Sequence, residues 1–420
     1  MFKIRYGIPE MSDKSGLLGT IVSSSPTSSI LFGPTGYTGH QGPTGSPNII
    51  SGGTNKLLYN NSGAAFSTSL ATINGSVINI SNLQISNLTT NYAPISLLGG
   101  TVEFYGDSIT LGIGLSVQAN RYSTLLSTQY GWTELNTAVS GDLTYDCVTK
   151  VYNNHVGGRT SFINIGFNDI TVTTVTDKLF YQSRNNYECM LLYLSLPSNN
   201  VVNTRSASVI KTGTWNNTTF TTLGMYTTTS GATASTTCTG RYVGFALTLG
   251  ANITVTIDGV VICTGLLLPA SGITTPNGTA ISQQIFLYDT FSSIGSTHTV
   301  LITNATATNL DIDWFFGFDT TTNFSSVIAI SPDQYDFSQT NAPYIGGTPA
   351  RRNTMLQIQR EACHKLRTEY NCKTYFVDAS TGWPAGFKGD DGVHPNPSGH
   401  KYIQNRVNSV LASGEFTTWM

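Results

Sequence analysis

Charge is scarce in this chain: Asp, Glu, Lys and Arg together make up 10% of the 420 residues, and the net charge is −2. No basic run or basic helix stands out that would neutralise a phosphate backbone and displace its counterions. Nucleic acid is therefore not expected as a partner. The low charge also argues against disorder by self-repulsion, and the length suffices for two or three domains with a large core.

Long hydrophobic runs are missing and cysteines are few. No stretch of about 18 apolar residues is present to span a bilayer, and MFKIRYGIPEMSDKSGLLG at the N-terminus lacks the apolar stretch of a signal peptide. Membrane insertion and conventional secretion are therefore not expected. The six cysteines are too scattered for a disulfide scaffold, and none forms a Cys-x-x-Cys pair. We expect no cofactor and no metal, and the cysteines leave the compartment open.

Glycine, in contrast, is abundant, with 42 residues, and in one segment it is periodic. Residues 33–47 read GPTGYTGHQGPTGSP, with glycine at every third position. Only the collagen triple helix requires that period, because no side chain fits at its crowded axis. We therefore predict a short collagen-like segment that joins three chains into a homotrimer. A flexible glycine-rich linker is the alternative.

The segments on either side of this repeat carry weaker signals. Residues 1–32 are assigned only as a segment for attachment to a virion or another particle. Residues 48–100 show short alternation of apolar and polar residues and a small repeat, ISNLQ followed by ISNLT. Such a stretch has little core of its own, so we predict a thin β-rich stem buried against sister chains. A flexible linker is again the alternative.

From residue 101 onward, strand patterns alternate with helix patterns except in one central stretch. The predicted strands are 101–105, 134–139, 161–165, 325–332 and 373–380, and the predicted helices are 177–195, 351–370 and 398–411. Residues 205–322 instead hold Thr-rich, strand-like runs with turn signals, typical of an antiparallel β-sandwich. Because neither α/β half has enough strands alone, we predict one α/β domain, 101–204 and 323–420, interrupted by this sandwich.

A serine, a histidine and a carboxylate lie in two loops of the predicted α/β domain. Ser108 follows a strand in TVEFYGDSITLGIG, and DDGVHPNPSGH at 390–400 places Asp391 three residues before His394. A serine hydroxyl becomes a nucleophile when a base takes its proton, and the base works best when an acid holds the correct imidazole tautomer. The spacing would bring the Asp391 carboxylate to Nδ1 of His394 while Nε2 faces outward.

Plainer interpretations of the same loops exist. Gly-Asp-Ser is also a common strand-to-helix turn, and the second loop is also a suitable cap for the last helix. A metal site built from Asp390, Asp391, His394 and His400 is a further alternative, although neither the number nor the spacing of these residues indicates a closed site.

Acyl transfer also needs donors for the oxyanion that develops on the carbonyl. Ser108, at a predicted helix start, offers its own backbone N–H. Gly141 in AVSGD and Asn168 in NIGFNDI each follow a predicted strand, and they offer an unshielded N–H and a side-chain amide. All these loops would lie at the carboxyl ends of strands, where open α/β sheets place their sites.

Four short blocks, in this order, resemble the SGNH, or GDSL-type, hydrolase family. They are GDSI at 106–109, Gly141 within VSGD, GFND at 166–169 and DGVHP at 391–395. The resemblance covers the α/β domain and neither the first hundred residues nor the insertion. It implies a flavodoxin-like three-layer α/β/α fold and hydrolysis of an ester or thioester.

The resemblance also implies a role for each site residue. Ser108 would be the nucleophile, His394 the general base and then acid, and Asp391 the residue that orients the imidazole. The backbone N–H of Ser108, together with Gly141 and Asn168, would form the oxyanion hole.

The inserted segment resembles the β-sandwiches of carbohydrate-binding modules, in which aromatic side chains stack on sugars. Its aromatic candidates are Trp215, Tyr242, Tyr288 and Trp314, for which a place in the core is the favoured interpretation. No glycan-binding residue is therefore assigned.

A collagen-like tract joined to a stem and an esterase head resembles phage tail fibres and surface proteins of large viruses. We therefore expect a serine esterase that removes O-acetyl groups from a cell-surface polysaccharide, as part of a trimeric fibre on a virion. One alternative is a non-catalytic adhesin or receptor-binding fibre that binds glycan on a hydrolase-like scaffold. Another is an extracellular esterase at a bacterial cell surface.

Overall fold

The computed structural model describes residues 60–61, 64–65, 71–74, 77–80, 100–171, 177–218, 221–249, 252–267, 273–275, 278–280, 283–333 and 346–413. The chain divides into two compact units, Met1–Asn91 and Tyr92–Met420. In the first unit, β1 (Asn60–Asn61) pairs with β2 (Ala64–Ala65) and β3 (Ala71–Asn74) with β4 (Val77–Ile80), both antiparallel. The predicted attachment and collagen-like segments lie outside the described residues, so the homotrimer stays a prediction.

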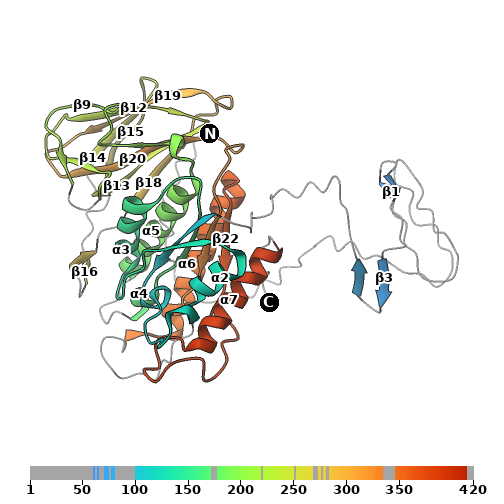
Figure 1. The fold of residues 1–420 in the computed structure, drawn as a ribbon. Helices are drawn as coiled ribbons and strands as arrows, with labels where there is room; N and C mark the ends of the chain where they lie inside the picture. Colours follow the sequence, from blue (N-terminus) through green and yellow to red (C-terminus); the bar gives the residue numbers. More distant parts are fainter. Residues whose placement is uncertain are drawn as a thin grey trace, which may run out of the picture. The chain divides into compact units, whose positions relative to one another are not determined.

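A five-stranded parallel sheet forms the centre of the second unit (Figure 1). Its strands are β5 (Thr101–Gly106), β6 (Thr133–Asn136), β7 (Thr160–Asn164), β21 (Val327–Ile330) and β22 (Thr374–Val377). They lie in the order β22-β21-β7-β5-β6. Strand order reverses between β5 and β7, as in flavodoxin-like doubly wound sheets, and such a switch point leaves a crevice at the carboxyl ends of the strands. The predicted α/β class is therefore confirmed for this unit.

Helices cover both faces of this sheet, which gives three layers (Figure 1). On one face, α2 (Tyr122–Tyr130) and α7 (Pro397–Ser413) share an apolar core with the strands. On the other face, α3 (Thr144–Asn154), α5 (Asp177–Ser195) and α6 (Pro349–Tyr370) share a second core. The sequence did not predict α2 and α3, because their apolar residues are interspersed with Thr, Ser and Asn and form only a narrow stripe.

Burial on both faces explains why the central strands do not alternate between apolar and polar residues. In β7, Phe162 belongs to the core shared with α2 and α7, whereas Ile163 belongs to the core shared with α3, α5 and α6. All four residues of β21 are buried in the same way. Such continuous apolar runs are typical of parallel strands covered by helices on each side.

Between Ser195 and Val327 the described chain forms two large antiparallel sheets and a two-stranded one, in which β16 (Ile273–Thr275) pairs with β17 (Gly278–Ala280). The six-stranded sheet consists of β8 (Val201–Asn203), β10 (Asn216–Asn217), β11 (Met225–Thr227), β13 (Tyr242–Leu249), β18 (Gln284–Asp289) and β20 (Leu310–Phe318). The five-stranded sheet consists of β9 (Ile210–Thr212), β12 (Thr233–Thr239), β14 (Asn252–Ile257), β15 (Val260–Leu267) and β19 (Thr297–Asn304). Apolar residues of both sheets share one core. Because β8 pairs with β20, the antiparallel strands begin ahead of the predicted boundary at 205.

Strand β20 is buried on both of its faces and joins the two parts of the unit. Leu310 and Ile312 contribute to the core between the antiparallel sheets, whereas Trp314 packs on the helices. The ring of Trp314 lies 5.9 Å from that of Tyr152 in α3 and 5.1 Å from that of Tyr193 in α5. Trp314 is 0% exposed, so of the four aromatic candidates it is a core residue and cannot stack on a sugar.

The antiparallel sheets branch from the amino edge of the parallel sheet. The chain leaves at the end of α5 and returns just before β21, and Ser325 N–H donates a 2.8 Å hydrogen bond to the Ser195 carbonyl. The loops that carry Ser108, Asn168 and His394 follow the carboxyl ends of strands instead. Branch point and candidate site are therefore at opposite edges of the parallel sheet.

Candidate active site

Ser108 lies at a tight junction between β5 and a short helix, α1 (Ser108–Leu111). Asp107 caps this helix, because its Oδ1 accepts a hydrogen bond of 3.0 Å from a first-turn N–H. The preceding Gly106 has no room for a side chain, since a Cβ there would lie 2.3 Å from the carbonyl oxygen of Asn164 in β7. The turn therefore holds Ser108 at the carboxyl edge, where the order of the strands reverses.

Ser108, His394 and Asp391 come together in the structure. His394 Nε2 lies 2.9 Å from Ser108 Oγ, and His394 Nδ1 lies 2.5 Å from Asp391 Oδ2. The other carboxylate oxygen, Oδ1, accepts the backbone N–H groups of Val393 and His394, both at 2.9 Å. These bonds fix the loop so that Nδ1–H points at Asp391 and Nε2 is left to accept the serine proton.

Burial and charge suit the three residues to this arrangement. Ser108 is 4% exposed and His394 is 7% exposed, whereas the side chain of Asp391 is 48% exposed. Burial works to raise the pKa of Asp391, but the hydrogen bonds from the His394 ring and from the backbone N–H of Val393 outweigh it and lower the pKa. Asp391 is therefore ionised at neutral pH and stabilises positive charge on the imidazole.

Gly141 and Asn168 lie on the loops after β6 and β7, the strands on either side of β5. Gly141 has a φ of 86°, a left-handed conformation that side chains disfavour. Asn168 is in α4 (Phe167–Thr171), and its Nδ2 donates a 2.8 Å hydrogen bond to the carbonyl of Asp142. This bond joins the Asn168 loop to the Gly141 loop. Their role as oxyanion donors stays a prediction.

Asp169, beside Asn168, makes a second link between these loops that the sequence analysis missed. Its carboxylate accepts bonds from the Thr144 N–H (3.0 Å), the Thr144 hydroxyl (2.8 Å) and the Ser183 hydroxyl (2.9 Å). Burial raises the pKa of Asp169 to about 6 in spite of these bonds. The signal in the sequence was a second polar residue next to Asn168, directly after a buried strand.

A buried ion pair lies behind the loop that carries His394, and the sequence analysis missed it too. Lys388 Nζ lies 2.6 Å from Asp333 Oδ2 and 2.6 Å from the carbonyl oxygen of Val393. Asp333 follows β21, and its side chain is fully buried. Burial raises the pKa of Asp333 and lowers that of Lys388, and the attraction between the two groups opposes both shifts. The pair holds the residue before His394 against the carboxyl edge.

Asp107 is fully buried beside Ser108, and burial raises its pKa to about 8. At neutral pH its carboxyl group is therefore mostly protonated. Within the described part of the chain, its Oδ2 has no hydrogen-bond partner. A neutral group at this position adds no negative charge where an oxyanion would develop, and it still caps α1.

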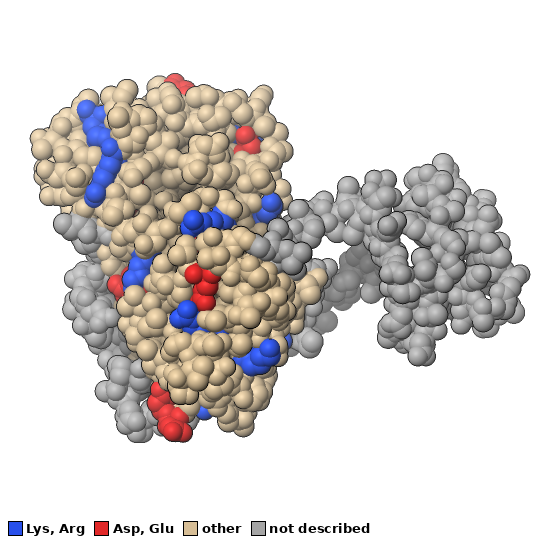
Figure 2. Space-filling view, in the orientation of Figure 1, with Lys and Arg blue, Asp and Glu red and all other residues tan. Residues whose placement is uncertain are grey.

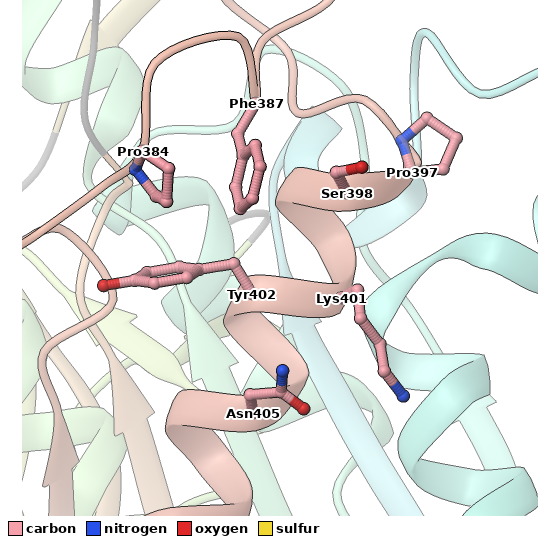
Figure 3. Close-up of a pocket in the computed structure, with 7 residues that line it drawn as sticks. All are labelled: Pro384, Phe387, Pro397, Ser398, Lys401, Tyr402 and Asn405. Carbon is pink, nitrogen blue, oxygen red and sulfur yellow. The ribbon is translucent and has the colours of Figure 1, made fainter.

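A pocket lies beside the loop that carries His394 (Figure 3). It is lined by Pro384, Phe387, Pro397, Ser398, Lys401, Tyr402 and Asn405. Phe387 belongs to this loop, and its carbonyl accepts a 3.0 Å hydrogen bond from the N–H of Asn396. Tyr402 is on α7 and packs against Trp383, with ring centroids 5.3 Å apart. The pocket thus combines aromatic faces with amide, hydroxyl and ammonium groups, and the triad lies outside its lining.

The described residues were compared with three other kinds of site: a charged surface, a metal centre and a membrane-spanning helix. In Figure 2, Lys and Arg are scattered among Asp and Glu, with no extended patch of one sign on the face shown. No three or more His, Cys, Asp or Glu side chains of the described residues are grouped to hold a metal ion. His400, a ligand in the alternative metal site, instead accepts a hydrogen bond from the Tyr122 N–H on Nδ1 at 3.3 Å. None of the helices within the described ranges could span a bilayer.

The other three aromatic candidates for sugar stacking are partly buried, and most of the cysteines are fully buried. Trp215 and Tyr288 are partly buried against the core of the antiparallel sheets, and Tyr242 is partly buried against the core shared with the helices. None of them is assigned to glycan binding. All six cysteines are free thiols, and only Cys263 is less than fully buried.

No protein-family model matches the chain, and a search of curated proteins finds no match. Solved structures resemble it at low identity. A carbohydrate acetylesterase family member from Sinorhizobium meliloti is 11% identical with a TM-score of 0.35, covering 75% of this chain and 98% of that one. A member of the lipolytic protein G-D-S-L family from Veillonella parvula is 10% identical with a TM-score of 0.35, covering 75% and 98%.

A two-domain esterase active on acetylated mannans, co-crystallised with mannopentaose, is 11% identical with a TM-score of 0.28, covering 52% of this chain and 90% of that one. These likenesses are too distant to transfer a function.

Proposed function

We propose that this chain is a serine hydrolase that cleaves carboxylic esters. The observation that carries the proposal is the continuous chain of contacts from Ser108 Oγ to His394 Nε2 and from His394 Nδ1 to Asp391. The same three groups in this order activate a serine hydroxyl for acyl transfer. Their place at the switch point of an α/β sheet, on a helix N-terminus, supports it.

In the proposed reaction, Ser108 Oγ attacks the ester carbonyl as its proton passes to His394 Nε2. Asp391 stabilises the imidazolium that results. The oxyanion is bound by the N–H of Ser108 and by Gly141 and Asn168. His394 then protonates the departing alcohol, and water, activated by the same imidazole, releases the acid from the acyl-enzyme.

Hydrolysis of p-nitrophenyl acetate by wild type, Ser108→Ala and His394→Ala tests this mechanism. Both substitutions should lower kcat by on the order of 10³ or more, because each removes the activated nucleophile. Asn154→Ala, at an exposed position at the end of α3, is the control and should keep wild-type kcat. Equal turnover by wild type and Ser108→Ala would contradict the proposal.

For the substrate, we propose an O-acetylated polysaccharide at a cell surface. The pocket of Figure 3 supports this, because aromatic faces beside amide and hydroxyl groups suit a sugar, and it adjoins the loop that carries His394. Acetate release from a panel of acetylated polymers tests it. Tyr402→Ala and Phe387→Ala should raise KM for the polymer and leave turnover of p-nitrophenyl acetate unchanged. An unchanged KM for every cleaved polymer would remove this pocket from the proposal.

We further propose that the chain forms a trimeric fibre on a virion, joined through its collagen-like segment and bound to the particle by its N-terminus. The period of glycine at 33–47 supports this. Light scattering on the full chain should give three times the chain mass, and a monomer would contradict it. Glycan binding that persists in Ser108→Ala, without cleavage of any ester by wild type, would favour the adhesin instead.

A further inference from the structure

A second group of Ser, His and Asp side chains in hydrogen-bond contact lies in the antiparallel sheets. Asp258 is in the turn between β14 and β15, His298 is on β19, and Ser292 is in the loop between β18 and β19. His298 Nε2 lies 2.9 Å from Ser292 Oγ, and His298 Nδ1 lies 2.7 Å from Asp258 Oδ2. Asp258 Oδ1 accepts the N–H of Thr299 at 2.8 Å, which orients the carboxylate.

The two sets of contacts are similar in the distance from serine to imidazole and in the exposure of the His and Asp side chains. The distance from serine to imidazole is 2.9 Å in both. The histidine side chains are 8% and 9% exposed, and the aspartates 48% and 49%. As for Asp391, burial works to raise the pKa of Asp258, but bonds from His298 and the Thr299 N–H outweigh it and lower the pKa. Asp258 is thus an anion at neutral pH.

Two hydroxyl groups, those of Ser292 and Thr290, lie near the imidazole of His298. Nδ1–H donates to the Asp258 carboxylate, so Nε2 is an acceptor. Thr290 is the other hydroxyl near Nε2, at 3.3 Å, but it donates to the Arg241 carbonyl at 2.8 Å. The Ser292 hydroxyl therefore lies between two acceptors, His298 Nε2 at 2.9 Å and Thr290 Oγ1 at 2.7 Å. Its Oγ becomes more nucleophilic when its proton moves to the imidazole.

The surroundings of Ser292 are those of an accessible site. Ser292 is half-buried, and the neighbouring Phe291 and Ile294 side chains are 72% and 65% exposed. Phe291 has a φ of 55°, a strained backbone conformation for a bulky residue and one that concentrates at functional positions.

We propose that Ser292 is a second nucleophilic serine, with His298 as its base and Asp258 as the residue that orients the base, acting on small unhindered esters. Ser292 Oγ forms the bond to the ester carbonyl carbon as its proton passes to His298 Nε2. The bond to the alkoxy group breaks, and the alcohol leaves with that proton. His298 Nε2 then takes a proton from water as the water oxygen attacks the acyl carbon, and it returns the proton to Ser292 Oγ as the acid is released. This site goes beyond the function proposed for Ser108.

A fluorophosphonate probe tests the proposal on the full chain, because it forms a bond from an activated serine oxygen to phosphorus and releases fluoride. Three proteins are compared: Ser108→Ala, Ser108→Ala with Ser292→Ala, and Ser108→Ala with Ser230→Ala. The labelled peptide is located by mass spectrometry. Ser230 is an exposed serine of the same sheets whose hydroxyl bonds only a carbonyl, at 3.4 Å, so it serves as the matched control.

Ser108→Ala should still take up label, on the peptide that contains Ser292, and so should the Ser230 control. Adding Ser292→Ala should reduce labelling by roughly tenfold or more, and His298→Asn should slow it to a similar degree because the base is lost. No label on native Ser108→Ala above that on heat-denatured protein would overturn the proposal, as would label that persists after Ser292→Ala. Label on Ser108 in wild type separately tests the first site.

Discussion

Lys388 and Asp333 are joined 2.6 Å apart in the interior, and the same ammonium group holds the carbonyl oxygen of Val393 at 2.6 Å. Val393 directly precedes His394, so this charge pair, which includes none of Ser108, His394 and Asp391, fixes the backbone that positions the His394 imidazole. Because Asp333 follows β21, the loop is anchored to a strand that lies next to β7 in the sheet. The position of the His394 side chain therefore depends on a salt bridge that makes no contact with Ser108.

Lys388→Met should lower the free energy of unfolding by about 3–5 kcal/mol, because it leaves the Asp333 carboxyl group in the interior without its partner. It should also lower kcat for p-nitrophenyl acetate by more than KM changes. Lys388→Met combined with Asp333→Leu should recover much of the stability but little of kcat, since the Val393 carbonyl has still lost its donor. Urea unfolding and steady-state kinetics measure both effects. Full recovery of kcat in the double variant would contradict a positioning role.

Asn168→Ala should lower kcat by on the order of 10²–10³ and change KM little, because the amide acts only on the charge that develops in the transition state. The measurement is steady-state hydrolysis of p-nitrophenyl acetate. Asn154→Ala, at an exposed asparagine at the end of α3, is the control. A rise in KM with unchanged kcat would show that Asn168 binds substrate rather than the oxyanion.

Asp391→Asn should lower kcat by on the order of 10⁴, the effect of placing the wrong imidazole tautomer before the serine in other triads. The fold should be retained, since an amide oxygen still accepts the N–H groups of Val393 and His394. Single-turnover acylation measures the loss directly. An Asp391→Asn variant with nearly wild-type acylation would mean that His394 is oriented by something other than this carboxylate.

Asp107→Asn should flatten the dependence of stability on pH. The pKa of Asp107 is raised from 3.8 to about 8 in the folded chain, so between these values the folded state binds more protons than the unfolded state. Wild type therefore loses stability from this residue as pH rises through that window. Asparagine still caps α1 and does not titrate. The stability difference between variant and wild type, from unfolding at several pH values, should move in favour of Asp107→Asn with rising pH.

Trp314→Ala should lower the free energy of unfolding by about 3–5 kcal/mol, the usual effect of emptying a large buried aromatic site. Trp314 lies where β20 meets α3 and α5, so both parts of the unit lose packing together. Thermal unfolding should remain a single transition at a lower midpoint. Two separate transitions in wild type would mean that the antiparallel sheets and the helices are not one cooperative body.

The parts of the site that the sequence predicted are those set by local geometry. A turn between a strand and a helix determines where Ser108 lies, and a spacing of three residues in a tight loop brings Asp391 to His394. The carboxyl-edge rule for parallel strands then places Asn168 and Gly141 beside them. The predicted strand at 161–165 and helix at 177–195 were also recognisable, because long apolar patterns of one period are specific to one element.

What could not be predicted depends on pairings between distant segments. Lys388 meets Asp333 only because β21 lies beside β22 and the loop folds back over it. Ser292, His298 and Asp258 are brought together by strand register in the antiparallel sheets, and in the sequence Asp258 signals only a turn before Gly259. For a related reason the sequence did not indicate the strand Val201–Asn203, ahead of the predicted boundary at 205, because it forms through its pairing with β20.

The chain leaves the parallel-sheet part of this unit at Ser195 and returns to it at Ser325, and this narrow neck determines how the two parts could be separated. One hydrogen bond spans the neck, so a short bridge would suffice to close the chain with the antiparallel sheets removed. The outward sides of α3 and α5, however, carry Tyr152 and Tyr193, which Trp314 covers. The parallel sheet and its helices, excised alone, would present this aromatic surface to water and self-associate. Replacing the antiparallel sheets with another domain would therefore require substitutions on the outward sides of α3 and α5.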